Sequence, residues 1–154
     1  MKIIHLIITS ILFFSNIFSQ ENKDDWSNLN RYKSDNKRLK KIKNNSPRVV
    51  FIGNSITEGW DWHYPQFFKS NKNYINRGIS GQTTPQMLVR FRQDVIDLDP
   101  DIVVILAGIN DIAENTGPST VKSITDNIKS MSELALSNDI KAVSYTHLTL
   151  PTTG

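Results

Sequence analysis

The chain has 154 residues, of which 18 are Lys or Arg and 15 are Asp or Glu, and it contains no cysteine. This length is enough for one domain with a sizeable core but short for two. The lack of cysteine excludes a disulfide framework and a thiolate metal site. The fold therefore has to be stabilised by packing.

Residues 1–19 have the pattern of a signal peptide. Lys2 precedes an apolar run over 3–18, and the small or polar residues Ser19 and Gln20 follow it. The run is short and interrupted by polar residues, which favours a cleaved export signal over a membrane anchor. We expect a secreted, periplasmic or cell-envelope protein without stable membrane insertion after cleavage. An uncleaved anchor is the alternative.

Residues 20–47 form a basic segment for which the sequence predicts a helix. Eight Lys or Arg residues and one acid, Asp35, lie between Arg31 and Arg48. From Val49 onward, acidic residues outnumber basic ones by eleven to eight. The basic charge is local, which argues against a nucleic-acid partner and favours a solvated helix face. A surface for acidic polysaccharide or anionic lipid is the alternative.

Short apolar runs separated by amphipathic stretches predict an α/β fold with a parallel sheet. The candidate strands are 49–52, 74–76, 102–106 and 140–143. The run over 102–106, Ile-Val-Val-Ile-Leu, is apolar throughout and is expected at the centre of the sheet. Functional residues are expected at the carboxyl ends of these strands, where ligands bind in such sheets.

Two apolar stripes at helical spacing predict helices between the strands. The first stripe runs from Met87 to Leu98, and Thr84 or Thr83 is expected to cap a helix that begins around Pro85. The second stripe comprises Val121, Ile124, Ile128, Met131 and Ala135. Ser119 or Thr120 is expected to cap the second helix.

The segment "FIGNSITEGW" places Ser55 just beyond the end of the first strand. Gly53 allows a tight exit from the strand, and a following helix would turn its backbone N–H groups and positive dipole end toward a developing anion. Ser55 is therefore a candidate nucleophile. On this segment alone, a helix-capping role for Ser55 is the competing interpretation.

Two further polar segments follow the next strands. In "NRGISGQTTPQML", a backbone N–H near Gly81 can point outward, although a glycine-rich turn before a capped helix explains the same residues. In "ILAGINDIAE", Asn110 can donate its amide to an oxyanion and Asp111 can hold the loop or cap a helix. Taken singly, Asn-Asp after a strand is typical of a turn.

Together, the three segments resemble blocks one, two and three of the SGNH (GDSL-type) hydrolases over residues 48–143. Gly53-Asn54-Ser55 stands where that family has Gly-Asp-Ser, so Asn54 replaces an aspartate. Gly81 matches the block-two glycine, and 108–111 matches Gly-x-Asn-Asp. The resemblance implies a three-layer α/β/α sandwich around a parallel sheet of the flavodoxin-like type, here without its last strand and helix.

The resemblance also implies acyl transfer to serine and then to water. Ser55 would attack an ester carbonyl, and the oxyanion would bind the N–H groups of Ser55 and Gly81 and the side-chain amide of Asn110. Three neighbours would support this arrangement: Gly53, Asn54 and Asp111. No cofactor and no metal are implied, because amides bind the oxyanion.

The base that the family draws from a later Asp-x-x-His is absent from this chain. His5 lies in the signal segment, and His147 has Ser144, not an aspartate, three residues before it. His63 follows the first block and is expected to contact substrate or to pack rather than to act as the base. Residues 144–154 do not continue the fold as the family requires, so we expect a non-native tail there.

Aromatic residues follow Ser55 closely: Trp60, Trp62 and, beside His63, Tyr64. They can stack on a sugar or line an acyl pocket, and loop packing is the alternative. The predicted function is that of a secreted serine esterase which cleaves acetyl or short acyl esters of carbohydrates or of other small molecules. A non-catalytic exported binding module, or an inactive fragment of the same fold, is the alternative.

Overall fold

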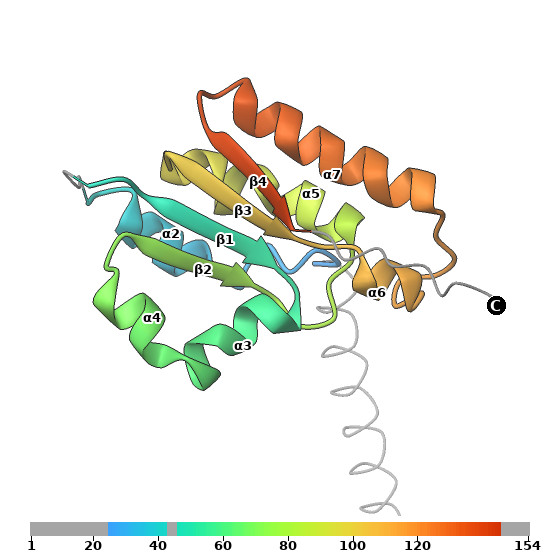
Figure 1. The fold of residues 1–154 in the computed structure, drawn as a ribbon, viewed down its shortest axis with the longest axis horizontal. Coiled ribbons are helices and arrows are strands. Elements are labelled where there is room, and N and C mark those ends of the chain that lie inside the picture. Colours follow the sequence, from blue (N-terminus) through green and yellow to red (C-terminus); the bar gives the residue numbers. More distant parts are fainter. Residues whose placement is uncertain (1–24, 43–45, 146–154) are drawn as a thin grey trace, which may run out of the picture.

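The structure is a computed structural model and describes residues 25–42 and 46–145. The predicted signal peptide and the tail beyond Tyr145 lie outside these ranges. Four parallel strands lie in the order β2-β1-β3-β4, with helices on both faces of the sheet (Figure 1). The predicted α/β fold with a parallel sheet is confirmed. Over the described ranges, no helix is both long enough and apolar enough to span a membrane.

The strands are β1 (Val49–Gly53), β2 (Tyr74–Gly78), β3 (Ile102–Leu106) and β4 (Lys141–Tyr145). The prediction for β3 matches these bounds, whereas β2 is longer and β4 begins and ends later than predicted. β1 and β3 are both inner strands, so 102–106 shares the centre with β1. The first two residues of the predicted tail belong to β4 and pair with 105–106 of β3.

The carboxyl ends of the three strands that precede the candidate motifs meet at one edge of the sheet. Gly53 at the end of β1 pairs with Gly78 of β2 and with Leu106 of β3. A Cβ at Gly53 would collide with the Thr57 hydroxyl and lie 2.9 Å from the Leu106 carbonyl oxygen. The close exit that was predicted from Gly53 is therefore required by packing.

One face of the sheet is covered by α5 (Thr84–Asp94), a 3-10 turn (Ile96–Leu98) and α7 (Val121–Leu136). Their apolar stripes pack on Val50, Ile52, Val103 and Ile105 of the inner strands. The predicted first helix is shorter than its stripe, because the α-helix ends at Asp94 and the 3-10 turn carries Leu98 into the core. Val121 is exposed, contrary to the prediction, because α7 reaches the core only from its second turn.

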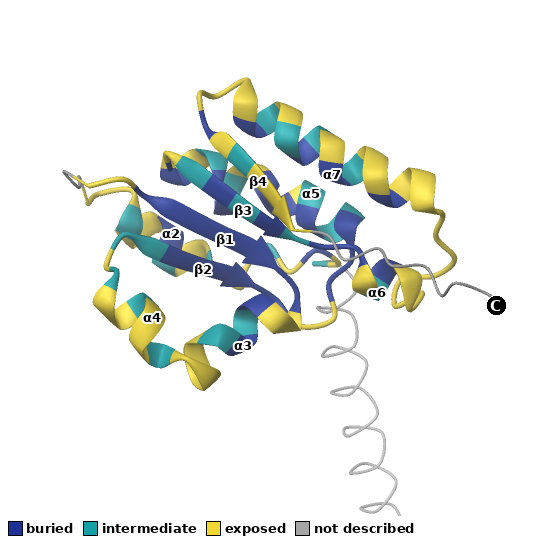
Figure 2. Ribbon diagram, in the orientation of Figure 1, coloured by how far each residue is buried: buried dark blue, intermediate teal, exposed yellow. Residues whose placement is uncertain are grey.

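The other face is covered over β1 and β2 by α3 (Ser55–His63) and α4 (Pro65–Ser70). Phe51 of β1 points into this layer, where its ring contacts those of Trp60, Phe67, Phe68 and Tyr74 at centroid distances of 5.5–5.7 Å. Figure 2 shows that burial differs between the strands, since β1 is buried along its length and β4 is largely exposed.

The structure of the N-terminal segment differs from the sequence prediction. Its helix is only seven residues long, α2 (Lys33–Leu39), and turns precede it. It is not merely a solvated face either, because Asn36 is buried and donates to the Asp94 carboxylate of α5 at 2.6 Å. Asp35 also pairs with the buried Arg77 of β2 at 2.8 Å. Sequence charge does not reveal these contacts, since they are made by the few uncharged or acidic residues of a basic stretch.

Candidate active site

Ser55 is the first residue of α3 and is exposed to solvent. The helix is capped by Asn54, whose Oδ1 accepts a hydrogen bond from the Ile56 N–H at 3.0 Å. The side chain that caps is thus Asn54 and not Ser55, which leaves the Ser55 hydroxyl free of that role. The backbone N–H of a first helical residue has no partner within the helix, so the Ser55 N–H is available to an anion.

Asn54 is 1% exposed, and its Nδ2 atom has no hydrogen-bond partner among the described residues. One end of this amide is therefore committed to the helix cap while the other end is an unmatched buried donor. An orphaned buried donor costs about 1–3 kcal/mol. The substitution of Asn for the aspartate of the resembled motif keeps the cap and removes a negative charge beside the helix N-terminus.

Gly81 lies in the loop between β2 and α5 and has a φ of +77°, a conformation that favours glycine. The neighbouring Ser80 is held by Glu58 of α3, whose carboxylate accepts from the Ser80 N–H at 2.8 Å and from its hydroxyl at 2.6 Å. Burial acts to raise the pKa of Glu58, but the hydrogen bonds from Ser80 and Arg31 outweigh it, and the pKa is lowered. Glu58 thus ties the loop of Gly81 to the helix of Ser55 as a carboxylate.

Asn110 lies in the short helix α6 (Ile109–Ile112), and its Nδ2 donates to the Gln82 carbonyl oxygen at 2.9 Å. This bond joins the third motif to the residue that follows Gly81. An Asn amide carries two N–H donors, so one remains for an oxyanion. Asn115, five residues on, donates in the same way to the Gly81 carbonyl oxygen at 3.1 Å.

Asp111 is 2% exposed and binds the start of α5. Both of its carboxylate oxygens accept from the Thr84 N–H at 3.0 Å, and one accepts from the Thr84 hydroxyl at 2.6 Å. Asn127 of α7 donates to that same hydroxyl at 3.0 Å. Asp111 therefore has both of the roles considered for it, because it caps the start of α5 and this contact holds its own loop in place.

Arg90 of α5 is fully buried and connects the first two motifs. Its guanidinium donates to Gln82 Oε1 at 2.5 Å, to the Gly53 carbonyl oxygen at 3.2 Å and to Asp94 at 3.0 Å. Burial lowers the pKa of Arg90, and Asp94 opposes that shift. Gly53 and Gln82 flank Ser55 and Gly81 in sequence, so a single buried cation bridges the two loops.

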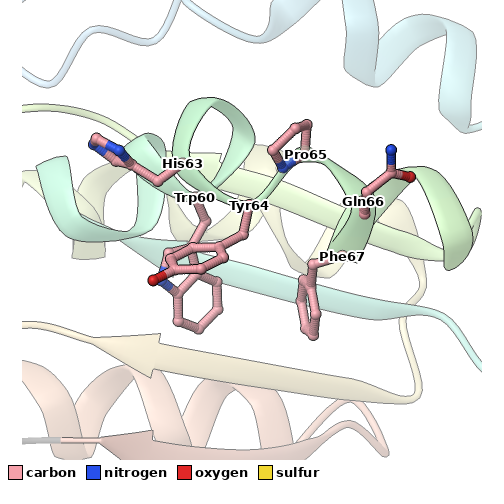
Figure 3. A pocket seen from close by; sticks show the side chains of 6 residues that line it. All are labelled: Trp60, His63, Tyr64, Pro65, Gln66 and Phe67. Atoms are coloured by element: carbon pink, nitrogen blue, oxygen red, sulfur yellow. The ribbon is translucent and has the colours of Figure 1, made fainter.

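A cavity of about 660 Å³ contains Ser55. Its other walls include Trp60, Trp62, His63 and Ser80. An adjoining apolar cavity of about 530 Å³ shares Trp60, His63 and Tyr64 with it and extends to the start of α4. Figure 3 shows the side chains of this second cavity, with the His63 ring turned away from those of Tyr64 and Phe67.

His63 is the last residue of α3, eight positions after Ser55. At 1.5 Å per residue, the two backbones lie about 12 Å apart along the helix axis, and within the described residues no hydrogen bond joins the imidazole to the Ser55 hydroxyl. His5 and His147 lie outside the described residues. Within the described ranges, no cluster of three or more His, Asp or Glu side chains forms a metal site.

Comparison with known proteins identifies the family. Residues 51–154 match the sequence profile of the GDSL-like lipase/acylhydrolase family. The chain belongs to this family. The match begins in β1 and includes the Ser55, Gly81 and Asn110 motifs, so the resemblance drawn from those motifs is confirmed.

Two crystal structures from Bacteroides resemble this fold. A Bacteroides fragilis protein to which acylhydrolase activity is ascribed has 57% sequence identity and a TM-score of 0.74, and the match covers 77% of this chain and 57% of that one. A GDSL-like lipase of Bacteroides thetaiotaomicron has 52% identity and a TM-score of 0.73, with the same coverage of 77% and 57%.

The lipoprotein YqeF of Bacillus subtilis, whose function is uncharacterised, is 36% identical over an alignment of 78 residues, and the match covers 42% of this chain and 32% of YqeF. This chain thus spans only part of each of these relatives.

Sequence reasoning missed the residues that hold the motifs together. Arg90 and Asp94 have the i, i+4 spacing that is common for ion pairs on helix surfaces. That spacing does not indicate burial, although both side chains are 0% exposed. Their position beside the Met87 to Leu98 stripe is the pattern that could have indicated burial. Glu58 gave no such indication, because its partner Ser80 is near it only in space.

Proposed function

We propose that this protein is an exported serine esterase which removes acetyl or short acyl groups from carbohydrates through an acyl-Ser55 intermediate. The observation that carries the proposal is the position of Ser55. Its side chain is exposed in a cavity at the start of a helix that another residue caps, beside loops carrying Gly81 and Asn110. Membership of the GDSL-like lipase/acylhydrolase family supports ester hydrolysis as the reaction class.

The residues fit the charge changes of the reaction. As the Ser55 oxygen bonds to the ester carbon, the carbonyl oxygen becomes an oxyanion, and the N–H groups of Ser55 and Gly81 with the Asn110 amide supply donors for it. The alcohol then leaves, and water releases the acyl group. The serine proton needs a base, and no hydrogen bond joins His63 to Ser55 within the described residues, so we assign this role to a residue outside 25–42 and 46–145.

The carbohydrate part of the proposal rests on the aromatic wall. Trp62 and Tyr64 are each 68% exposed next to Ser55, which leaves their rings free to pack on a ligand. An acetyl xylan esterase of Geobacillus stearothermophilus shares the fold at 21% identity and a TM-score of 0.55. The fold therefore accommodates a polysaccharide esterase.

Export is supported by the pattern of residues 1–19 and by the name of the lipoprotein relative. A cell-envelope location would bring the site into contact with polysaccharides outside the cytoplasm. Expression of the full gene with a C-terminal tag, followed by cell fractionation, tests this location. Recovery of the mature protein without residues 1–19 in the envelope or medium is the expected result.

Steady-state turnover tests the enzymatic proposal. The full-length protein, read from the source locus through and beyond the codons for 142–154, should release acetate from acetylated xylo-oligosaccharides, and Ser55→Ala should lower kcat by at least about 10⁴-fold. A folded full-length protein with no turnover of any acetyl ester would contradict the proposal. It would favour the non-catalytic binding module, for which the supporting observation is that no imidazole among the described residues is hydrogen-bonded to Ser55.

A further inference from the structure

A smaller cavity, of about 240 Å³, adjoins the Ser55 cavity at Ser80. It lies between the N-terminal segment and the loop of Gly81, and Trp26, Gln86 and Asn115 are among the residues that line it. Ser80 lines both cavities.

The N-terminal wall of this cavity is held in place by hydrogen bonds. Three glutamine amides bind backbone carbonyl oxygens of the segment: Gln86 binds Trp26 at 2.6 Å, Gln82 binds Ser27 at 2.7 Å and Gln93 binds Leu29 at 2.7 Å. The wall is also joined to α3 through the ion pair of Arg31 with Glu58, at 3.1 Å. The cavity is thus formed before any ligand arrives.

The lining favours an uncharged ligand. It includes no Lys, Arg or His, which disfavours an anion. Its carboxylate, Asp25, already accepts the N–H groups of Leu29 at 2.6 Å and Asn30 at 2.9 Å, which leaves it little capacity for a cation. The Gln86 and Asn115 amides each donate one N–H within the protein, to the carbonyl oxygens of Trp26 and Gly81. Each amide keeps a second N–H, which can donate to a hydroxyl group of a sugar.

Trp26 supplies the flat apolar surface that a sugar ring needs, since its side chain is only half-buried and lines the cavity. Sites for drug-sized ligands have volumes of about 300–1,000 Å³. This cavity is smaller, so it suits one sugar ring rather than several. We propose that this cavity is a sugar subsite, which binds the ring next to the acylated one when the ester lies at Ser55. The inference rests on the proposed carbohydrate esterase function.

The test compares Trp26→Ala with wild type in the full-length protein. On acetylated xylo-, gluco- and manno-oligosaccharides, the ratio of kcat/KM to that for p-nitrophenyl acetate should fall about tenfold for the preferred sugar. Trp26→Phe, which keeps an aromatic face, should restore most of the ratio. Leu136→Ala, at an exposed position on α7, is the matched control and should keep the wild-type ratio.

A binding measurement separates failure of the subsite from failure of the enzymatic proposal. Calorimetric titration with the same oligosaccharides after deacetylation should give a Kd about tenfold weaker for Trp26→Ala than for wild type. If turnover is absent but this difference is present, the esterase proposal fails and the subsite stands. If Trp26→Ala keeps both the wild-type ratio and the wild-type Kd with all three sugars, the subsite is overturned.

Discussion

The two sides of Ser55 are built on different principles. On the side of the β2–α5 loop, buried polar groups cross-link the backbone, as when Arg90 joins Gln82, Gly53 and Asp94. On the side of α3, aromatic rings such as Trp62 and Tyr64 stand exposed. The hydrogen bonds of the first arrangement fix the positions of the backbone groups that they join. The exposed rings of the second arrangement offer contact surface and are restrained by few neighbours.

This difference suggests a division of labour. Oxyanion donors must be in place before charge develops, because reorganising them during the reaction would cost activation free energy. Substrate contacts gain from surfaces that accept more than one shape. Changes on the cross-linked side should therefore affect stability and kcat, and changes on the aromatic side should affect KM.

Arg90→Met is expected to have the largest effect on stability. It removes one partner of a fully buried ion pair and leaves Asp94 without its cation, which typically lowers the free energy of unfolding by about 3–5 kcal/mol. Urea denaturation followed by circular dichroism measures the loss. The exposed Arg92→Met on the same helix is the control and should change stability by less than about 0.5 kcal/mol. Equal stability of both variants would contradict the bridging role of Arg90.

Asn110→Ala should lower kcat on a small activated acetate ester by about 10²–10³-fold, because it removes a proposed oxyanion donor. Asn115→Ala is the matched control, because its amide ties the same loop through the Gly81 carbonyl oxygen but is not a proposed oxyanion donor. A decrease of less than about tenfold is expected for the control. Similar decreases in the two variants would mean that Asn110 acts only as a loop tether.

Trp62→Ala tests the aromatic side. Loss of its exposed ring should raise KM for an acetylated oligosaccharide by about tenfold, which corresponds to about 1.4 kcal/mol of binding, with a smaller change in kcat. Initial-rate kinetics on the oligosaccharide measure both constants. A variant with a lower kcat and an unchanged KM would show that Trp62 acts in the catalytic step, and it would contradict the proposed difference between the two sides of Ser55.

Glu58→Gln should have the smallest effect, and that effect should depend on pH. Because the folded-state pKa of Glu58 is lowered, its carboxylate stabilises the fold above the ordinary glutamate pKa, and this contribution is lost as the pH falls through the folded-state value. The variant should be less stable than wild type by about 1 kcal/mol at pH 7, and the difference should shrink as the pH falls through the folded-state pKa of Glu58. Glu133→Gln, on the exposed side of α7, is the control. If the stability difference did not depend on pH, the charge of Glu58 would not be its cause.

Periodicity and motifs predicted the strands and the three loops of the site because these features are local. Continuous apolar runs mark buried parallel strands, and Thr83 and Thr120 mark the helix starts that they cap. The core positions of α5 and α7 follow from the same spacing, apart from Val121 at a helix end.

The cross-links between the loops could not be predicted, because they join residues far apart in sequence. Gln82 and Ser27 are 55 positions apart, and Arg90 and Gly53 are 37 positions apart. A buried arginine also contradicts the usual exposure of charged residues. The contacts of the N-terminal segment could not be predicted for the same reason, since its charge pattern says nothing about Asn36 or about the carbonyl oxygens that the glutamines bind.

Covalent trapping of Ser55 tests the central claim most directly. The full-length protein is incubated with a fluorophosphonate probe, digested and analysed by peptide mass spectrometry, with Ser55→Ala and the neighbouring Ser80→Ala treated in parallel. The account predicts a single adduct on the peptide containing Ser55, retained in Ser80→Ala and absent from Ser55→Ala. A folded protein that takes up no probe, or an adduct that persists in Ser55→Ala, would contradict it.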